Sequence, residues 1–283
     1  SLPAGRAFHA TVAATPFNSR VDGDGYLYAL GGIETKGGGP VTSVLRAPIN
    51  GDATVGTWSE VATLPQPLHS LEAAIFRSNI YVSGGATTGD EPVTAVYRAS
   101  VDTLGNLGSW QSLRSLPNAR AHHEMTVIGN CLHVFDGDSA SFDPDYGQLT
   151  DTRYLDIART TIDLRSDDLA ADWTIDDTQP SKARNRHTAV IAGGVVLRTA
   201  GWYNGIGTSG ASENLYAPIQ SSCDVDSFNG ANNAQSIKSK GGGNLFNHAA
   251  VSFVDGSGTA HVMILGGDDV DSPGNKRSAV WFY

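Results

Sequence analysis

The chain has 283 residues, a formal net charge of −10, 33 glycines and only 17% charged residues. This length fits one large all-β domain or two smaller ones, and the turn-rich composition favours short strands over long helices. The acidic balance disfavours a phosphate backbone as a partner, so we expect no nucleic acid. The longest uncharged apolar stretch, Ala189 to Leu197, is too short to cross a bilayer, so we expect no membrane span.

A short apolar strand is predicted five times along the chain, each time close to a histidine. These histidines are His9, His69, His123, His187 and His248. Each strand leads through a turn to a second apolar strand that ends in glycine, as in Gly31-Gly32 and Gly84-Gly85. The histidines lie about 60 residues apart, so the chain is built from a repeat of that size.

Two further strands are predicted in each repeat. The third strands lie near Val44, Val96, Arg153, Leu215 and Ala279, and a fourth begins at Trp58, Trp110 or Trp173 in three repeats. Four short antiparallel strands per repeat are typical of one propeller blade. We therefore predict a single domain over 1–283, with blades at approximately 4–63, 64–115, 116–178, 179–240 and 241–283.

These motifs resemble the kelch family, in which a diglycine closes the second strand, a tryptophan lies in the fourth and an arginine often precedes the first. The Arg-x-x-His form is present at Arg6/His9, Arg120/His123 and Arg184/His187. The resemblance extends over the whole chain. It implies an all-β, kelch-like β-propeller of about five blades, each a four-stranded antiparallel sheet.

Three repeats depart from this pattern. Asp136-Gly137 and Ala200-Gly201 replace the diglycine in the third and fourth repeats, and the fourth repeat lacks the tryptophan. The last repeat ends at Tyr283 in its third strand, so we expect the last blade to lack its outer strand in this chain. A partner strand, or a second copy of the chain, could complete such an open edge.

One face of the predicted propeller carries polar and aromatic loops, and function usually lies in such loops. Its candidate ligand-binding residues are Arg6, Arg120, Arg184, Arg186, Trp202, Tyr203, Asn204, Asp268 and Asp269. Exposed aromatic rings beside Asn and Arg suit a sugar ring or a peptide. Packing against a neighbouring loop is the alternative for Trp202 and Tyr203.

Two groups of residues could hold a metal ion. The carboxylates of Asp136, Asp138, Asp143 and Asp145 could bind Ca²⁺, but their spacing favours solvated turns. The five repeat histidines could hold a transition metal, yet recurrence in every blade favours a structural role. We therefore expect no cofactor, with Ca²⁺ as the alternative.

The two cysteines, Cys131 and Cys223, are expected in neighbouring blades on the opposite face. They form either one disulfide, which would indicate an oxidising compartment, or two buried thiols. The sequence leaves both alternatives open, because the distance between the two Cα atoms decides between them.

The chain contains no Gly-x-Ser-x-Gly, phosphate-loop or His-Glu-x-x-His motif. We therefore expect a non-catalytic binding domain, secreted or at the cell surface, that engages a protein or a glycan through its loop rim. One alternative is a structural or assembly subunit whose open fifth blade is completed by a partner strand. The other is a carbohydrate-active enzyme, epimerase-like or oxidase-like, with a site at the channel mouth.

Overall fold

The computed structural model describes most of the first half of the chain and parts of the second. The described residues are 2–14, 25–52, 54–139, 154, 156–176, 186–199, 201, 214–220, 223–230, 245–246, 248–254, 256–265, 268–269 and 280–282. Within them the structure consists of strands and turns, with no helix, so none of these residues belongs to a helix that could span a membrane.

The chain divides into two compact units. Unit 1 comprises Ser1–Ala121, Ser139–Ser141 and Ile162–Trp173. Unit 2 comprises His122–Asp138, Phe142–Thr161 and Thr174–Tyr283. Every sheet lies entirely within one unit, so each unit is described by itself.

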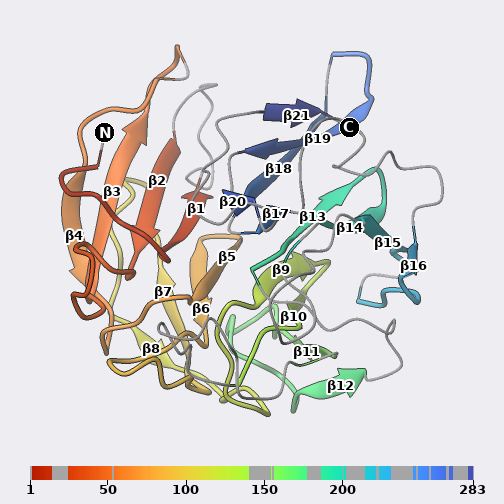
Figure 1. Ribbon diagram of the computed structural model, residues 1–283, viewed down its shortest axis with the longest axis horizontal. Coiled ribbons are helices and arrows are strands. Elements are labelled where there is room, and N and C mark those ends of the chain that lie inside the picture. The colour runs from red at the N-terminus through yellow and green to blue at the C-terminus, as the bar shows by residue number, and fades with distance from the viewer. Residues whose placement is uncertain are drawn as a thin grey trace. The chain divides into compact units, whose positions relative to one another are not determined.

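Four sheets each contain four antiparallel strands whose neighbours follow the chain order (Figure 1). Unit 1 contains β1 (Ala10–Ala14), β2 (Gly25–Leu30), β3 (Ser43–Ile49) and β4 (Ser59–Thr63), followed by β5 (Glu72–Phe76), β6 (Asn79–Ser83), β7 (Val96–Ser100) and β8 (Gln111–Ser112). Unit 2 contains β9 (Glu124–Ile128), β10 (Cys131–Phe135), β11 (Ile157–Thr161) and β12 (Thr174–Asp176), followed by β13 (Thr188–Ala192), β14 (Val195–Thr199), β15 (Asn214–Pro218) and β16 (Asn229–Gly230).

The C-terminal strands form two smaller sheets. One has three strands in the order β18 (Ala249–Val254), β19 (Ala260–Leu265) and β21 (Val280–Phe282), and the other pairs β17 (Leu245–Phe246) with β20 (Asp268–Asp269). The all-β, propeller-like architecture is thus confirmed. The sequence predicted five blades, whereas the described part of the chain contains four complete ones and this three-stranded sheet.

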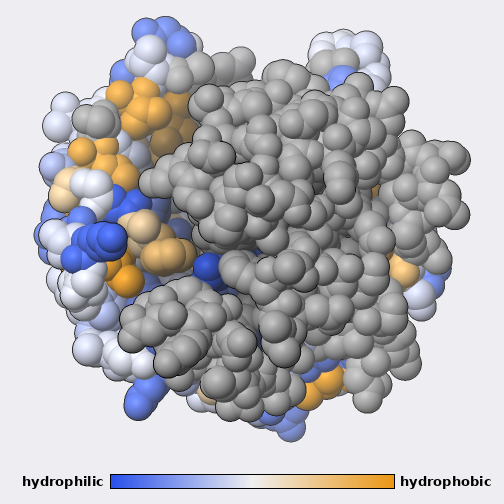
Figure 2. Space-filling view, in the orientation of Figure 1, coloured by the Kyte–Doolittle hydropathy of each residue, from blue (hydrophilic) through white to orange (hydrophobic). Residues whose placement is uncertain are grey.

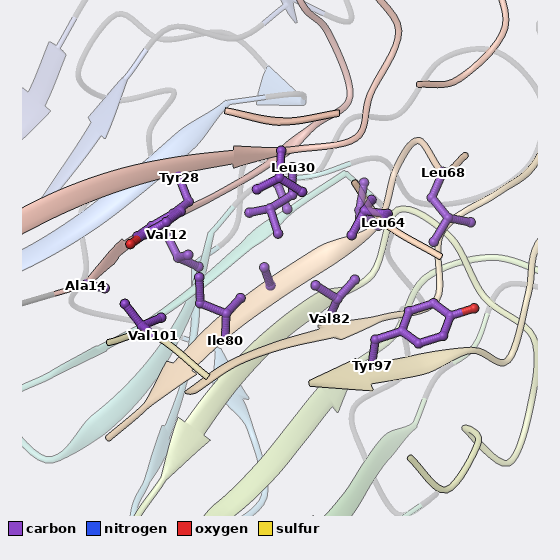
Figure 3. Packing of buried hydrophobic residues seen from close by; sticks show 14 residues of the cluster. Val12, Ala14, Tyr28, Leu30, Leu64, Leu68, Ile80, Val82, Tyr97 and Val101 are labelled. Carbon is purple, nitrogen blue, oxygen red and sulfur yellow. The ribbon is translucent and has the colours of Figure 1, made fainter. Parts of the chain in front are cut away.

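The core of unit 1 lies between its two four-stranded sheets. Val12 and Tyr28 of the first sheet join Ile80 and Val82 of the second in one buried cluster (Figure 3). Full burial of an aliphatic side chain of this size stabilises the fold by about 1.5–3 kcal/mol. Apolar packing between consecutive sheets therefore holds this unit together.

The glycines that end the second strands bind the backbone that leads into the next repeat. The N–H of Gly32 donates to the carbonyl of Leu68 (2.8 Å), and the N–H of Gly85 donates to that of Arg120 (2.9 Å). A Cβ atom on Gly32, whose φ is +90°, would lie only 2.6 Å from the carbonyl oxygen of Ala7. The second glycine of the motif is therefore needed both for its backbone conformation and for this close approach.

The first strand of the second repeat is aligned differently from the sequence prediction. Four repeats have a histidine directly before their first strand: His9, His123, His187 and His248. His69 instead lies further from β5, and Leu71 takes the matching place. A Cβ on Gly32 would meet the Cβ of His9 at 2.8 Å, just as one on Gly85 would meet that of Leu71. The five histidines are therefore not equivalent in the repeat, contrary to what the sequence had suggested.

A recurring pair of side chains joins sheets at the other end of the strands. From the second strands, Tyr28 donates to the Gly105 carbonyl (2.6 Å), Tyr81 donates to that of Asp167 (2.6 Å), and His133 Nε2 lies 2.9 Å from that of Cys223. Their cross-strand partners Arg46, Arg98 and Arg159 reach the same loops, at Leu104, Ser166 and Cys223. We call each such pair a clamp, and three clamps join consecutive repeats.

Candidate functional site

The most unusual side chains of unit 2 are buried charges, beginning with Asp136. This residue directly follows β10, where unit 1 has the first glycine of each diglycine. Its φ is 52°, compared with 62° for Gly31 and 52° for Gly84. Aspartate tolerates this left-handed conformation better than most residues. The exposed fraction of Asp136 is 0%, so the strand end places a carboxylate in the interior.

Arg198 is a second departure from the repeat, in β14. The matching second-strand positions hold the buried apolar residues Ala29, Val82, Val134 and Ile264. Arg198 is fully buried, forms an ion pair with Asp136, and lies over the ring of Phe228 at 4.8 Å from its centroid. Burying an unpaired charge costs several kcal/mol, so each of the two charges depends on the other.

The guanidinium of Arg198 stays protonated at neutral pH despite its burial. Burial lowers the pKa of Arg198 to about 9, and the adjacent carboxylate of Asp136 opposes that shift. The buried ring of His187 lies nearby, with Nε2 3.9 Å from Asp136 Oδ2. These three side chains bring an acid, a base and a cation together at the end of β10.

A second pair joins His122 to Asp138, which is buried and lies two residues beyond Asp136 in the same loop. His122 Nδ1 is 3.3 Å from Asp138 Oδ2, and Asp138 is 0% exposed. The carbonyl of His122 accepts a hydrogen bond from the N–H of Arg186 (3.0 Å), which joins the third and fourth repeats.

The predicted calcium ligands have other partners where the structure describes them. Asp136 pairs with Arg198 and Asp138 with His122, while Asp143 and Asp145 lie outside the described residues. Among the described residues no three His, Cys, Asp or Glu side chains group as metal ligands would. The calcium site therefore stays a prediction.

His248 has a structural role in unit 2. Its Nε2 lies 2.8 Å from Thr199 Oγ1 and 3.1 Å from Thr188 Oγ1. Burial lowers the pKa of His248 to about 4, so the ring is neutral at physiological pH. A neutral, hydrogen-bonded ring in this place agrees with the structural role that the sequence favoured for the repeat histidines.

Two of the predicted rim arginines are buried. The side chain of Arg6 is 1% exposed and donates to the carbonyls of Gly31 and Ser43, both at 3.0 Å, while its ion pair with Glu34 is 2.5 Å long. Arg120 is 0% exposed. Both guanidinium groups thus lie inside unit 1 rather than on the exposed rim that the sequence predicted, because a long side chain before the first strand can turn inward.

The remaining rim residues are described only in part. Arg186 is half-buried, with a φ of 53°. Asp268 and Asp269 are described as backbone only, in β20. The candidates outside the described residues are Arg184, Trp202, Tyr203 and Asn204. Their place on a binding surface stays a prediction.

Cys131 and Cys223 form a disulfide, which was one of the two alternatives left open by the sequence. Their Cα atoms are 5.6 Å apart, and the bond joins β10 to the loop before β16. Arg159 and His133 contact the carbonyl of Cys223 as well. The disulfide therefore reinforces the third clamp.

The fourth repeat replaces its tryptophan with Phe228, which sequence reasoning missed. Phe228 directly precedes β16, just as Trp58, Trp110 and Trp173 precede their fourth strands. It is 5% exposed and meets Phe135 edge to face, with centroids 6.1 Å apart. The sequence feature that could have revealed this residue is an aromatic side chain directly before the Asn229-Gly230 pair.

A groove lies at the edge of the first sheet of unit 1. It has a volume of about 600 Å³ and is lined by Leu2, Pro3, Val55, Gly56, Thr57 and Trp58. Val55 is 46% exposed, whereas Leu107, which makes the matching bridge in the next repeat, packs against the core. In the orientation of Figure 1, the surface over this sheet shows hydrophobic residues beside hydrophilic ones (Figure 2).

The fold and these contacts define an all-β protein built from propeller-like blades. No protein-family model matches the chain, and no curated protein matches it either.

Proposed function

We propose that the chain is a kelch-like propeller domain, with the C-terminal three-stranded sheet as its fifth blade, that binds a protein or a glycan through one loop rim. The observation that carries this proposal is the unequal length of the loops. The loops between second and third strands cover 31–42, 84–95, 136–156 and 200–213, whereas three of the loops between first and second strands cover only 77–78, 129–130 and 193–194. Long loops on a regular scaffold are where binding residues concentrate.

The disulfide supports an extracytoplasmic location for this domain. Disulfides persist in oxidising compartments and are rare in reducing ones. Cys131 and Cys223 are the only cysteines of the chain and they are bonded to each other. We propose that the protein is secreted or displayed at the cell surface.

A glycan array followed by calorimetric titration tests the binding proposal. Trp202→Ala with Tyr203→Ala should weaken binding of any glycan hit at least about tenfold, because stacked aromatic rings are typical binding anchors. Tyr216→Ala is the matched control, since it removes an exposed aromatic ring from β15. Full binding by the double variant would contradict the proposed rim. If no glycan binds, the glycan form of the proposal fails and the protein form remains to be tested by cross-linking from residue 203.

An assembly role is the second candidate, favoured by the three-stranded sheet. β21 pairs with β19 on one side and has no second neighbour among the described strands. An edge of this kind can accept a strand from another chain. Light scattering at increasing protein concentration should then show a dimer or larger assembly, and a strict monomer would contradict self-assembly.

A carbohydrate-active enzyme is the third candidate, favoured by the cluster of His187, Asp136 and Arg198. Such side chains can act as acid, base and anion-binding group. Asp136 and Arg198 are fully buried and already form an ion pair with each other, which makes this candidate weaker than binding at the loop rim.

A further inference from the structure

Blade 2 contains a hydrogen-bonded Ser–His–Asp arrangement within unit 1. His69 Nδ1 lies 3.0 Å from Ser70 Oγ, and His69 Nε2 lies 2.9 Å from Asp90 Oδ1. Both distances are within the range in which a base activates a hydroxyl and a carboxylate orients the base. The three residues come from two segments, the approach to β5 and the loop between β6 and β7.

The repeat does not require these side chains. His69 makes the bridge to Ala86 that Ala7 makes to Ile33 in the first repeat. Ser70 has the same left-handed backbone as its counterparts Phe8, His122 and Arg186, with φ values between 52° and 56°. The fold thus fixes the backbone here but accepts quite different side chains, so its architecture does not explain a serine beside a histidine.

The loop that carries Asp90 holds this carboxylate in place. Asp90 has a φ of 58°, and its N–H donates to the carbonyl of Thr87 (3.1 Å). The N–H of Thr87 in turn donates to the carbonyl of Glu91 (3.0 Å). These two hydrogen bonds fix the turn that places the Asp90 carboxylate beside His69.

We propose that Ser70, His69 and Asp90 form an activated-serine site that cleaves a small carboxylic ester. When the Asp90 carboxylate accepts a hydrogen bond from the N–H at Nε2 of His69, Nδ1 carries no proton. Nδ1 can then accept the hydroxyl proton of Ser70. The exposed fractions of His69 and Ser70 are 5% and 6%. Because these side chains are so little exposed, only a small substrate could reach them, and we expect a short acyl chain such as acetyl.

The reaction balances without a cofactor. Ser70 Oγ forms a bond to the carbonyl carbon while His69 Nδ1 takes the hydroxyl proton. The tetrahedral intermediate expels the alkoxide or phenoxide, which receives that proton, and an acyl-serine remains. Water, deprotonated by Nδ1, then attacks the acyl carbon, and Ser70 leaves with the proton.

A fluorophosphonate reagent and p-nitrophenyl acetate test this site in the native full chain. Intact-mass and peptide mapping should find one adduct, on Ser70, formed with loss of fluoride. Ser70→Ala should abolish the adduct, while Ser112→Ala, which changes an exposed serine of β8, should keep it. Asp90→Asn should slow both labelling and ester hydrolysis about 100-fold, because the base loses its orienting carboxylate.

Glu91→Gln is the matched control for Asp90→Asn, since it removes a neighbouring exposed carboxylate of the same loop. It should label at the wild-type rate. Circular dichroism and melting temperature verify that each variant is folded. A native wild-type protein that forms no adduct on Ser70, or equal rates in Asp90→Asn and Glu91→Gln, would overturn the proposal. This result is independent of the rim, because glycan binding can persist when labelling fails.

Discussion

The two units pack their consecutive sheets against each other with different side chains. In unit 1 the second strands end in diglycine, and the position matching Arg198 is filled by Ala29 or Val82, so the packing is apolar at these positions. In unit 2, Asp136 takes the first-glycine position of the third repeat and Arg198 takes the apolar position of the fourth. The two side chains pair with each other beside a cluster that includes Phe135 and Phe228. The comparison teaches that the repeat tolerates buried charges when both members of a pair change together.

The largest effect is expected from breaking that pair in unit 2. Arg198→Ala leaves the carboxylate of Asp136 buried without its cation, which should lower the free energy of unfolding by about 3–5 kcal/mol. Urea denaturation measures this loss. Arg46→Ala, at a more exposed arginine of unit 1, is the control and should cost less than about 1 kcal/mol. Equal losses in the two variants would show that burial of the pair is unimportant.

Removing the disulfide sharpens the comparison, because only unit 2 has one. Cys131→Ser with Cys223→Ser should lower the free energy of unfolding by about 2–4 kcal/mol, since the unfolded chain regains the freedom of a long loop. Calorimetry with and without reductant measures the change. Reductant should destabilise the wild type and leave the double variant unaffected; insensitivity of the wild type would contradict the bond.

The pH dependence of stability tests whether His248 of unit 2 is neutral in the folded protein. The pKa of His248 falls from 6.5 to about 4 on folding, so between these values the unfolded chain binds more protons. The stabilising contribution of neutral His248 is therefore complete above pH 6.5 and is lost as the pH falls towards 4, a change of about 3 kcal/mol.

His248→Gln should remove this component of the pH dependence in chemical denaturation. His261→Gln on neighbouring β19 is the control and should keep it. An unchanged pH profile in His248→Gln would contradict the burial of a neutral ring.

The smallest effect is expected at the first clamp of unit 1. Tyr28→Phe removes the hydroxyl that donates to the carbonyl of Gly105, so stability should fall by about 1 kcal/mol. Tyr216→Phe, at an exposed side chain of β15, is the control, and thermal unfolding is the measurement. Equal melting temperatures of the two variants would mean that the clamp contributes nothing.

The sequence predicted most of the strands, because glycine-ended apolar runs recur at a regular period. The third strand of the third repeat was expected near Arg153, whereas β11 covers Ile157–Thr161. The prediction failed where a single residue type was used to align the repeats with one another. His69 looked equivalent to the other histidines, but Leu71 has that backbone position, and only the neighbouring glycine contacts reveal this. Phe228 was missed in the same way, since this phenylalanine takes the position before the fourth strand that other repeats fill with tryptophan.

The candidate site was less predictable than the fold. Arg6 and Arg120 are charged and lie before first strands, so the sequence favoured exposure, but backbone carbonyls such as that of Gly31 bind Arg6 inside. Asp136 was recognised as a departure from diglycine, yet its partner is far away in sequence. Ion pairs between repeats depend on side-chain direction, which a periodic pattern does not encode.

A double-mutant cycle at Asp136 and Arg198 tests most directly whether the two departures act as one unit. Asp136→Gly and Arg198→Val restore the residues that other repeats use. Each single variant should lose stability, whereas the double variant should recover at least about 2 kcal/mol of the summed loss. Additive losses would contradict the account, because they would show that the aspartate and the arginine are accommodated independently.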